Sequence, residues 1–183
     1  MEKEIETRFL EINKESLISK LISLGALDKG EEKLEQIIFK SKLWDHKGKF
    51  IRLRKTHGKF KLTYKEQIDL TIDGAREIEF EVSDWNKCIL FLEKSGITAI
   101  RNIEKYRHTL VINNVYFDID TWPKIPAYVE VEGPSIEAIK EACSLVGLNW
   151  ENKFDGTPWE VFMHYGLNLD KISVITFTEF KEI

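Results

Sequence analysis

The sequence predicts an α+β fold, a closed or nearly closed antiparallel β-barrel with helices packed on its outside. Several segments alternate charged and apolar residues with period two, as in 59–66, where Phe60, Leu62 and Tyr64 alternate with lysine and threonine. The charges also segregate, so that some of these strands are acidic and others basic. Segments with helical periodicity carry apolar stripes that can cover the apolar faces of the strands. If the helices lie outside, the charged faces must turn inward.

Length and composition restrict the class of protein. A chain of 183 residues suits one domain over 1–183, and its net charge of −4 gives no bulk electrostatic case for nucleic-acid binding. We expect no membrane partner, because no stretch is long and apolar enough to cross a bilayer, and the N-terminus does not resemble a signal peptide. Cys88 and Cys143 lie in apolar helical stretches without metal-ligand spacing, which predicts buried, reduced thiols. These features predict a cytoplasmic protein.

Turn residues and alternating patterns divide the chain into strands. We expect strands over residues 4–8, 34–42, 49–55, 59–66, 76–82, 99–111, 115–120, 128–132 and 173–177. Turns are expected at Asp45–Gly48, His57-Gly58, Asp73-Gly74 and Asn113-Asn114.

Capping residues mark four helices between these strands. The expected N-caps are Asn13, Asp84, Ser135 and Thr157, with helices running through about residues 24, 95, 147 and 165. The last of them begins Thr157-Pro158-Trp159-Glu160, which fits a capping box with proline at the first helical position.

The charged faces of the strands have two interpretations. Any single strand of this kind more often presents its charges to water. Together they favour an interior, because like charges at i, i+2 spacing repel each other on a solvated face, and here they recur on several strands. The acidic sets are Glu4/Glu6, Glu77/Glu79/Glu81, Asp118/Asp120 and Glu130/Glu132; the basic sets are Arg52/Arg54, Lys61/Lys65 and Lys105/Arg107. A barrel interior with acidic and basic sectors suits divalent metal ions on one side and a polyphosphate on the other.

The N-terminal strand Glu4-Ile5-Glu6-Thr7-Arg8 resembles the E-x-E-x-K strand of the CYTH superfamily, the triphosphate tunnel metalloenzymes. This superfamily includes class IV adenylyl cyclases, thiamine triphosphatases and inorganic triphosphatases. The resemblance continues in order through Ile51–Arg54, Lys61–Lys65, Arg76–Glu79, Lys105–Arg107, Phe117-Asp118 and Val129–Glu132. Arg8 departs from the pattern, since lysine is usual there; the charge is kept, but a planar fork replaces a point charge.

The resemblance implies an eight-stranded tunnel and a set of site residues. The ligands of Mg²⁺ or Mn²⁺ would be Glu4, Glu6, Asp118, Glu130 and Glu132. The triphosphate would contact Arg8, Arg52, Arg54, Lys61, Lys65, Lys105 and Arg107, with Lys153 as the basic residue expected near the C-terminal end. Glu77 and Glu79 would line the substrate site, either on a second metal ion or orienting a basic neighbour. The catalytic set would be Glu4, Glu6, Arg8, Lys65 and Arg107.

The preferred reaction is metal-dependent hydrolysis of a small-molecule triphosphate, because it requires only a bound triphosphate, a metal ion and a water molecule. The alternative within the superfamily is a class IV adenylyl cyclase, in which the ribose 3′-hydroxyl of ATP attacks the α-phosphorus and pyrophosphate leaves. Two alternatives of other classes are a non-catalytic binding protein for phosphate compounds and a β-barrel interaction protein with solvent-facing charges. The protein would be a monomer or a homodimer.

Overall fold

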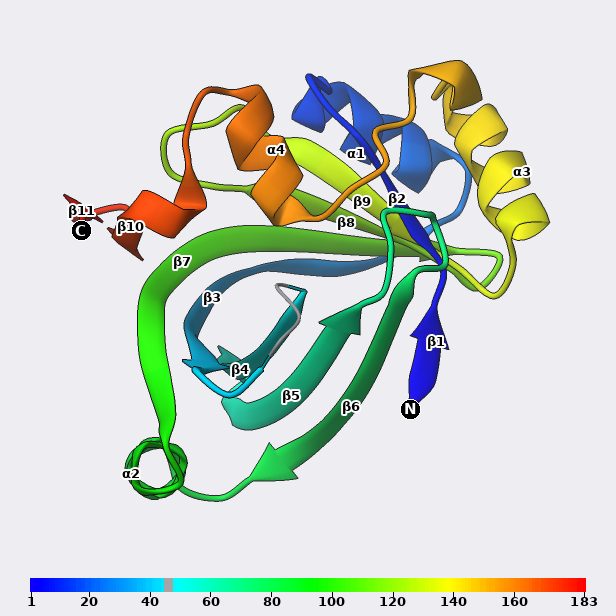
Figure 1. Cartoon of the computed structure of the whole chain (residues 1–183). Coiled ribbons are helices and arrows are strands. Elements are labelled where there is room, and N and C mark those ends of the chain that lie inside the picture. Colours follow the sequence, from blue (N-terminus) through cyan, green and yellow to red (C-terminus); the bar gives the residue numbers. More distant parts are fainter. Residues whose placement is uncertain (45–47) are drawn as a thin grey trace.

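The computed structural model describes residues 1–44 and 48–183, so most of the predicted turn at Asp45–Gly48 lies outside the described residues. Its strands form one sheet, shown in Figure 1. They are β1 (Glu2–Glu4), β2 (Glu6–Phe9), β3 (Leu27–Ser41), β4 (Lys49–Thr56), β5 (Lys59–Gln67), β6 (Ala75–Val82), β7 (Ile97–Ile112), β8 (Val115–Thr121), β9 (Tyr128–Glu132), β10 (Ile172–Ile175) and β11 (Phe180–Glu182).

The N-terminal segment closes the sheet into a barrel. The strand path runs β1-β6-β5-β4-β3-β7-β8-β9-β2, so it begins and ends with two halves of the same segment. Glu4 pairs with Ala75 of β6, whereas Glu6 pairs with Glu132 of β9. Between them, the carbonyl of Ile5 accepts a 3.1 Å hydrogen bond from the backbone N–H of Gly133. Because β1 and β2 share one place, the described path has eight places, which confirms the predicted eight-stranded barrel.

The described residues form four α-helices outside the barrel, each starting at a predicted cap. They are α1 (Lys14–Ser23), α2 (Trp85–Lys94), α3 (Ile136–Val146) and α4 (Pro158–His164). The side chains of Asn13, Asp84 and Ser135 each accept a hydrogen bond from the backbone N–H three residues further on, and α4 begins with a capping box. Among the described residues, no helix combines the length and apolar character that crossing a bilayer demands.

Apolar clusters hold the helices on the barrel. Helices α1 and α3 cover the outer faces of β7, β8 and β9, where Leu21, Phe117 and Ile139 are fully buried (Figure 1). Helix α2 covers β3, β4 and β5 through Leu92, which packs on Phe39 and Leu53. Strand residues that face outward therefore form the core, and the charged residues between them face inward.

A third apolar cluster closes one end of the barrel. Val161 and Phe162 of α4 pack there against Trp122, which follows β8, and against interior side chains of β3, β7 and β9: Ile38, Ile103 and Tyr128. At the other end, near the starts of β5 and β8 and the end of β9, Tyr116 and Glu132 are exposed and Lys61 is partly exposed. The charged interior is therefore reached from that end.

Two expectations differ from the structure, at the start of β3 and on the outer face of β6, whereas the predicted tail strand is present. Strand β3 begins at Leu27 rather than residue 34, because it pairs with β7 over a longer stretch that contains an irregularity between Asp28 and Glu31. The tail strand predicted at 173–177 is β10, which pairs with both β7 and β11. The helices do not cover all of the apolar outer face: on β6, Ile78 and Phe80 are 48% and 54% exposed.

Candidate active site

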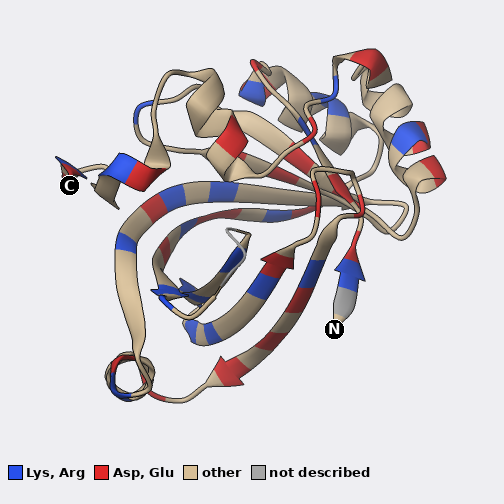
Figure 2. Cartoon of the chain, viewed as in Figure 1, with Lys and Arg blue, Asp and Glu red and all other residues tan. Residues whose placement is uncertain are grey.

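Charged side chains face one another across the interior because the strand register aligns them. Arg107 lies opposite Asp120, and Glu130 lies between Asp118 and Arg8. The polar residues that line the barrel are strongly buried: Arg8, Lys105, Asp120 and Glu130 are 4%, 3%, 0% and 9% exposed. Basic bands on β5 face acidic bands on β6 in Figure 2. This confirms that charged strand faces form the interior.

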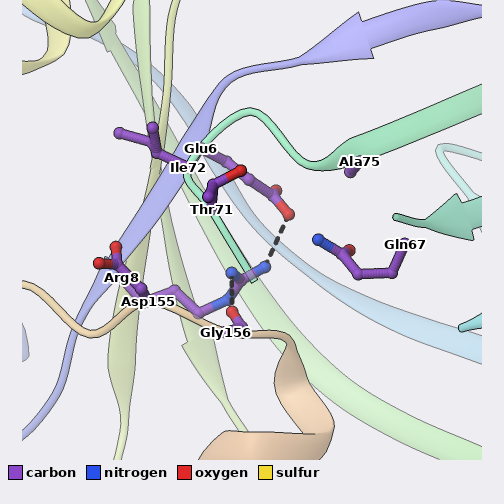
Figure 3. A pocket seen from close by; sticks show the side chains of 8 residues that line it. All are labelled: Glu6, Arg8, Gln67, Thr71, Ile72, Ala75, Asp155 and Gly156. Atoms are coloured by element: carbon purple, nitrogen blue, oxygen red, sulfur yellow. Dashed lines mark hydrogen bonds and ion pairs between the residues drawn. The ribbon is translucent and has the colours of Figure 1, made fainter. Parts of the chain in front are cut away.

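Arg8 lies at the centre of the acidic sector. Its Nη2 donates to Glu6 Oε1 at 2.9 Å and to Glu130 Oε2 at 2.5 Å, and its Nη1 donates to the carbonyl of Gly156 (Figure 3). Burial alone would lower the pKa of Arg8, but the charges of Glu130 and Glu6 raise that pKa above its usual range. Arg8 is therefore charged and is held mainly by protein groups.

Lys65 is the second cation of this sector. Its Nζ forms an ion pair with Glu4 and lies 3.5 Å from Glu6 Oε1. Burial opposes its charge, but Glu6 and Glu4 raise the pKa of Lys65. Burial raises the pKa of Glu4, and so does Glu77 beside it, although Lys65 counters them. Glu77 Oε2 is buried and has no hydrogen-bond partner in the part of the chain that the structure describes.

The acidic sector retains excess negative charge at Glu132. Partial burial, followed by the charges of Glu4, Glu130 and Glu6, raises the pKa of Glu132 to about 7. None of the ion pairs between described residues involves Glu132. A divalent cation would relieve this repulsion, and carboxylate oxygens are the donors that Mg²⁺ and Mn²⁺ prefer.

These carboxylates fit a metal ion in chemistry, but they do not already converge. No group of three or more His, Cys, Asp or Glu side chains within the described residues has the arrangement of a ready metal site. Arg8 and Lys65 take up oxygens of Glu4, Glu6 and Glu130 instead. Metal binding would therefore exchange some of these ion pairs for metal–oxygen bonds.

Asp120 holds two buried cations. Its oxygens lie 2.7 Å from Nε and 2.7 Å from Nη2 of Arg107, and 2.5 Å from Lys105 Nζ. Burial opposes ionisation of Asp120, but Arg107 and Lys105 lower its pKa overall. Burial, reinforced by Arg107, lowers the pKa of Lys105 to about 7. Lys105, predicted to contact substrate, is thus a partner of Asp120 and lies 4.9 Å from the centre of the Trp122 ring.

Arg107 connects the two sectors. Besides Asp120, it forms an ion pair with Asp118 and lies 3.2 Å from Glu130 Oε1. Thr109 also donates to Asp118, at 2.6 Å. The structure therefore brings Asp118 and Glu130 together around one guanidinium.

The basic sector includes one acid, Glu79. Lys61 lies 2.6 Å from Glu79, and Thr63 donates to it at 2.8 Å. Arg52 Nη2 lies 3.3 Å from Thr63 Oγ1 and 3.7 Å from Glu79. Burial alone would raise the pKa of Glu79, but hydrogen bonds from Lys61 and Thr63 lower it. Glu79 is thus in contact with basic neighbours, whereas its predicted role in the substrate site stays a prediction.

Among the described cations that line the barrel interior, Arg54 has the least compensation. Its Nε donates to Gln36 at 3.3 Å, and no carboxylate of the described residues forms an ion pair with it. Burial, then repulsion by Arg52 and Arg107, lowers the pKa of Arg54 to about 9, which leaves it charged at neutral pH. Arg52 Nε is also buried without a hydrogen-bond partner in the described chain. The basic sector therefore has a charge and donors that an anion can satisfy.

Lys153 stands apart from these groups. It forms an ion pair with Asp155, and its Nζ lies 5.8 Å from the centre of the Trp150 ring.

Sequence reasoning missed three contributors to the site. Asp120 shared the period-two signal of Asp118, whereas Gln36 had no distinguishing pattern, and Gly156 acts through its backbone carbonyl.

Comparison with known proteins agrees with this geometry. The CYTH domain family matches residues 2–146, so the chain belongs to the CYTH family. The PH1012 protein of Pyrococcus horikoshii is 28% identical, with a TM-score of 0.73 over 84% of this chain and 96% of that one. A search of curated proteins found no match.

Two more distant structures share the fold. A Vibrio parahaemolyticus protein provisionally named an adenylate cyclase is 12% identical, with a TM-score of 0.75 over 88% of this chain and 98% of that one. A provisionally named adenylyl cyclase from Hippeastrum, described as having a dominant triphosphatase activity, is 16% identical, with a TM-score of 0.60 over 91% and 97%.

Proposed function

We propose that this protein is a divalent-metal-dependent phosphohydrolase that binds a triphosphate inside the barrel. The observation that carries the proposal is Arg54, a partly buried guanidinium without a carboxylate partner among the described residues, beside Arg52 and Arg107. A charge that is withdrawn from water in this way is costly unless a counter-ion accompanies it. Guanidinium groups match phosphate oxygens with paired, charge-assisted hydrogen bonds.

The residues divide into two proposed roles. Those that would bind phosphate oxygens are Arg52, Arg54, Lys61, Lys65 and Arg107. Those that would hold Mg²⁺ or Mn²⁺ are Glu4, Glu6, Asp118, Glu130 and Glu132. When bound, the metal ion would neutralise phosphate charge and activate a water molecule. Lys105 and Asp120 are too deeply buried to meet the ligand and would hold Arg107 in place.

The contribution of the chain itself is alignment and charge neutralisation, which is most of what phosphoryl transfer requires. Arg52 and Arg54 would fix the triphosphate against the wall formed by β4 and β5. Arg107, held by Asp120, would meet the charge that develops on the departing diphosphate. The closed end of the barrel, where Trp122 packs on α4, would keep bulk water out.

Hydrolysis is preferred over cyclisation because it requires only a bound triphosphate, a metal ion and a water molecule. The test is an assay with tripolyphosphate, thiamine triphosphate and ATP, each with Mg²⁺ and Mn²⁺, following orthophosphate, pyrophosphate and cyclic AMP together. We expect metal-dependent orthophosphate release. Cyclic AMP with stoichiometric pyrophosphate would establish the cyclase instead, and no product from any of them would contradict the proposal.

Arg54→Gln supplies the residue-level test, and Lys55→Gln is its matched control. Lys55 follows on the same strand, points to the opposite face and is largely exposed, so both variants remove one positive charge from β4. A hydrogen bond to a charged group contributes about 1.5–3 kcal/mol, so Arg54→Gln should raise KM or lower kcat/KM about 10- to 100-fold. Equal kinetics in the two variants would contradict the phosphate-binding role of Arg54.

A further inference from the structure

The segment Trp150–Gly156 completes the barrel wall beside the acidic sector. Strand β2 pairs with β9 on one edge; on its other edge, Arg8 and Phe154 form an antiparallel bridge in which the Phe154 N–H donates to the Arg8 carbonyl at 2.7 Å. Asp155 and Gly156 then line a small pocket with Glu6 and Arg8 (Figure 3). This segment follows residues 2–146, the part that the family match covers.

The donors of Arg8 are largely committed to the protein. Of the five N–H groups of a guanidinium, two on Nη2 are used by Glu6 and Glu130, and one on Nη1 by the Gly156 carbonyl. Nε is buried and has no partner within the described chain. Arg54, in contrast, has a single side-chain hydrogen bond within the described residues, to Gln36. Arg8 is therefore poorly placed to bind phosphate and well placed to fix two carboxylates.

Local backbone chemistry directs the Gly156 carbonyl toward Arg8. Gly156 has a φ of +138°, a backbone conformation that L-residues with a side chain rarely adopt. A Cβ added there would lie 3.0 Å from Glu160 Cβ. The next residue, Thr157, donates its backbone N–H to Glu160 Oε2 at 2.7 Å within the capping box of α4. The start of α4 thus fixes the carbonyl that anchors Arg8.

We propose that Arg8 is a positioning residue, which the Gly156 carbonyl holds against Glu6 and Glu130, and that Trp150–Gly156 is thereby a working part of the metal site. The inference rests on the proposed function, since it takes Glu6 and Glu130 as metal ligands. Arg8 and Lys65 both contact Oε1 of Glu6. With Oε1 held in this way, Oε2 is the oxygen that Glu6 would offer to the metal ion.

The test measures Mn²⁺ affinity by electron paramagnetic resonance, without any triphosphate, in the full-length protein. Gly156→Ala should disturb the carbonyl, and Gly166→Ala is the matched control, because Gly166 also has a positive φ, +79°, but a Cβ there meets nothing within 4 Å. We expect Gly156→Ala to weaken Mn²⁺ binding at least fivefold and Gly166→Ala to leave it unchanged. Thermal unfolding of both variants shows whether they are folded.

Arg8→Lys keeps the charge but cannot reach both carboxylates and the carbonyl together, so it is the second variant. It should weaken Mn²⁺ binding, and adding Gly156→Ala to it should cause no further loss, since the two changes break one connection. If Gly156→Ala fails to fold, we expect a fivefold loss in Arg8→Lys alone. Additive losses, unchanged affinity or tighter binding would overturn the inference.

The outcome for the unmodified protein separates this inference from the proposed function. Failure of the unmodified protein to bind Mn²⁺ would contradict the proposed function and the inference with it. If the unmodified protein binds Mn²⁺ and Gly156→Ala binds it with equal affinity, the inference alone is overturned.

Discussion

Asp120→Asn should destabilise the fold by leaving buried cations without their counter-ion. Asp120 is 0% exposed and accepts from Lys105 at 2.5 Å and from Arg107 at 2.7 Å. Removing one partner of a buried ion pair costs about 3–5 kcal/mol. Arg107 keeps Asp118 and Glu130, and Lys105, whose pKa is about 7, can release its proton when Asp120 is removed, so we expect the low end, about 3 kcal/mol.

Thermal and urea unfolding at pH 7 would measure this loss. For a chain of this size, about 3 kcal/mol corresponds to a fall in Tm of about 6–12 °C. Glu81→Gln is the control, because its ion pair with Lys59 is exposed and should contribute less than about 1 kcal/mol. Adding Lys105→Met to Asp120→Asn should restore at least half of the stability, since it replaces the buried amine that has lost its partner by an apolar side chain. A loss below about 1 kcal/mol, or no recovery in the double variant, would refute this reasoning.

Two further predictions concern other groups. Glu132→Gln should raise Tm by about 1–3 °C in EDTA, because it relieves repulsion among partly solvated carboxylates. The same variant should weaken Mn²⁺ binding. A lower Tm in EDTA would contradict the repulsion that Glu4, Glu130 and Glu6 impose on Glu132. Burial raises the pKa of Cys143 to about 12. At pH 8, iodoacetamide should therefore leave Cys143 unmodified in the folded protein and alkylate it in urea, which mass spectrometry would measure. Rapid alkylation without urea would contradict the burial of Cys143.

Much of the barrel could be predicted from local patterns. Period-two alternation located β4, β5 and β6, and the caps at Asn13, Asp84 and Ser135 located three helices. The break at Ile5, which sends Glu4 to β6 and Glu6 to β9, could not be predicted, because both halves have the same alternation. The exposed outer face of β6 was also missed, since sequence periodicity shows that a face is apolar but not whether a helix covers it.

The site could be predicted as a list of charges, but not as a set of pairs. Period two indicated that Arg54 and Asp120 face the same interior; their partners depend on strand register. Gln36 beside Arg54 and the Gly156 carbonyl on Arg8 come from segments without any charge pattern. The metal ligands, the phosphate contacts and the single domain over residues 1–183 stay predictions.

The most direct test of the central claim is calorimetric titration of tripolyphosphate into the unmodified protein and into Arg54→Gln, with EDTA present so that no metal-dependent hydrolysis occurs. A triphosphate that pairs with the uncompensated guanidinium of Arg54 should bind the unmodified protein stoichiometrically, and the variant about 10- to 100-fold more weakly, as expected for losing charge-assisted hydrogen bonds of about 1.5–3 kcal/mol. Equal affinity in both proteins, or no binding to either, would contradict the account.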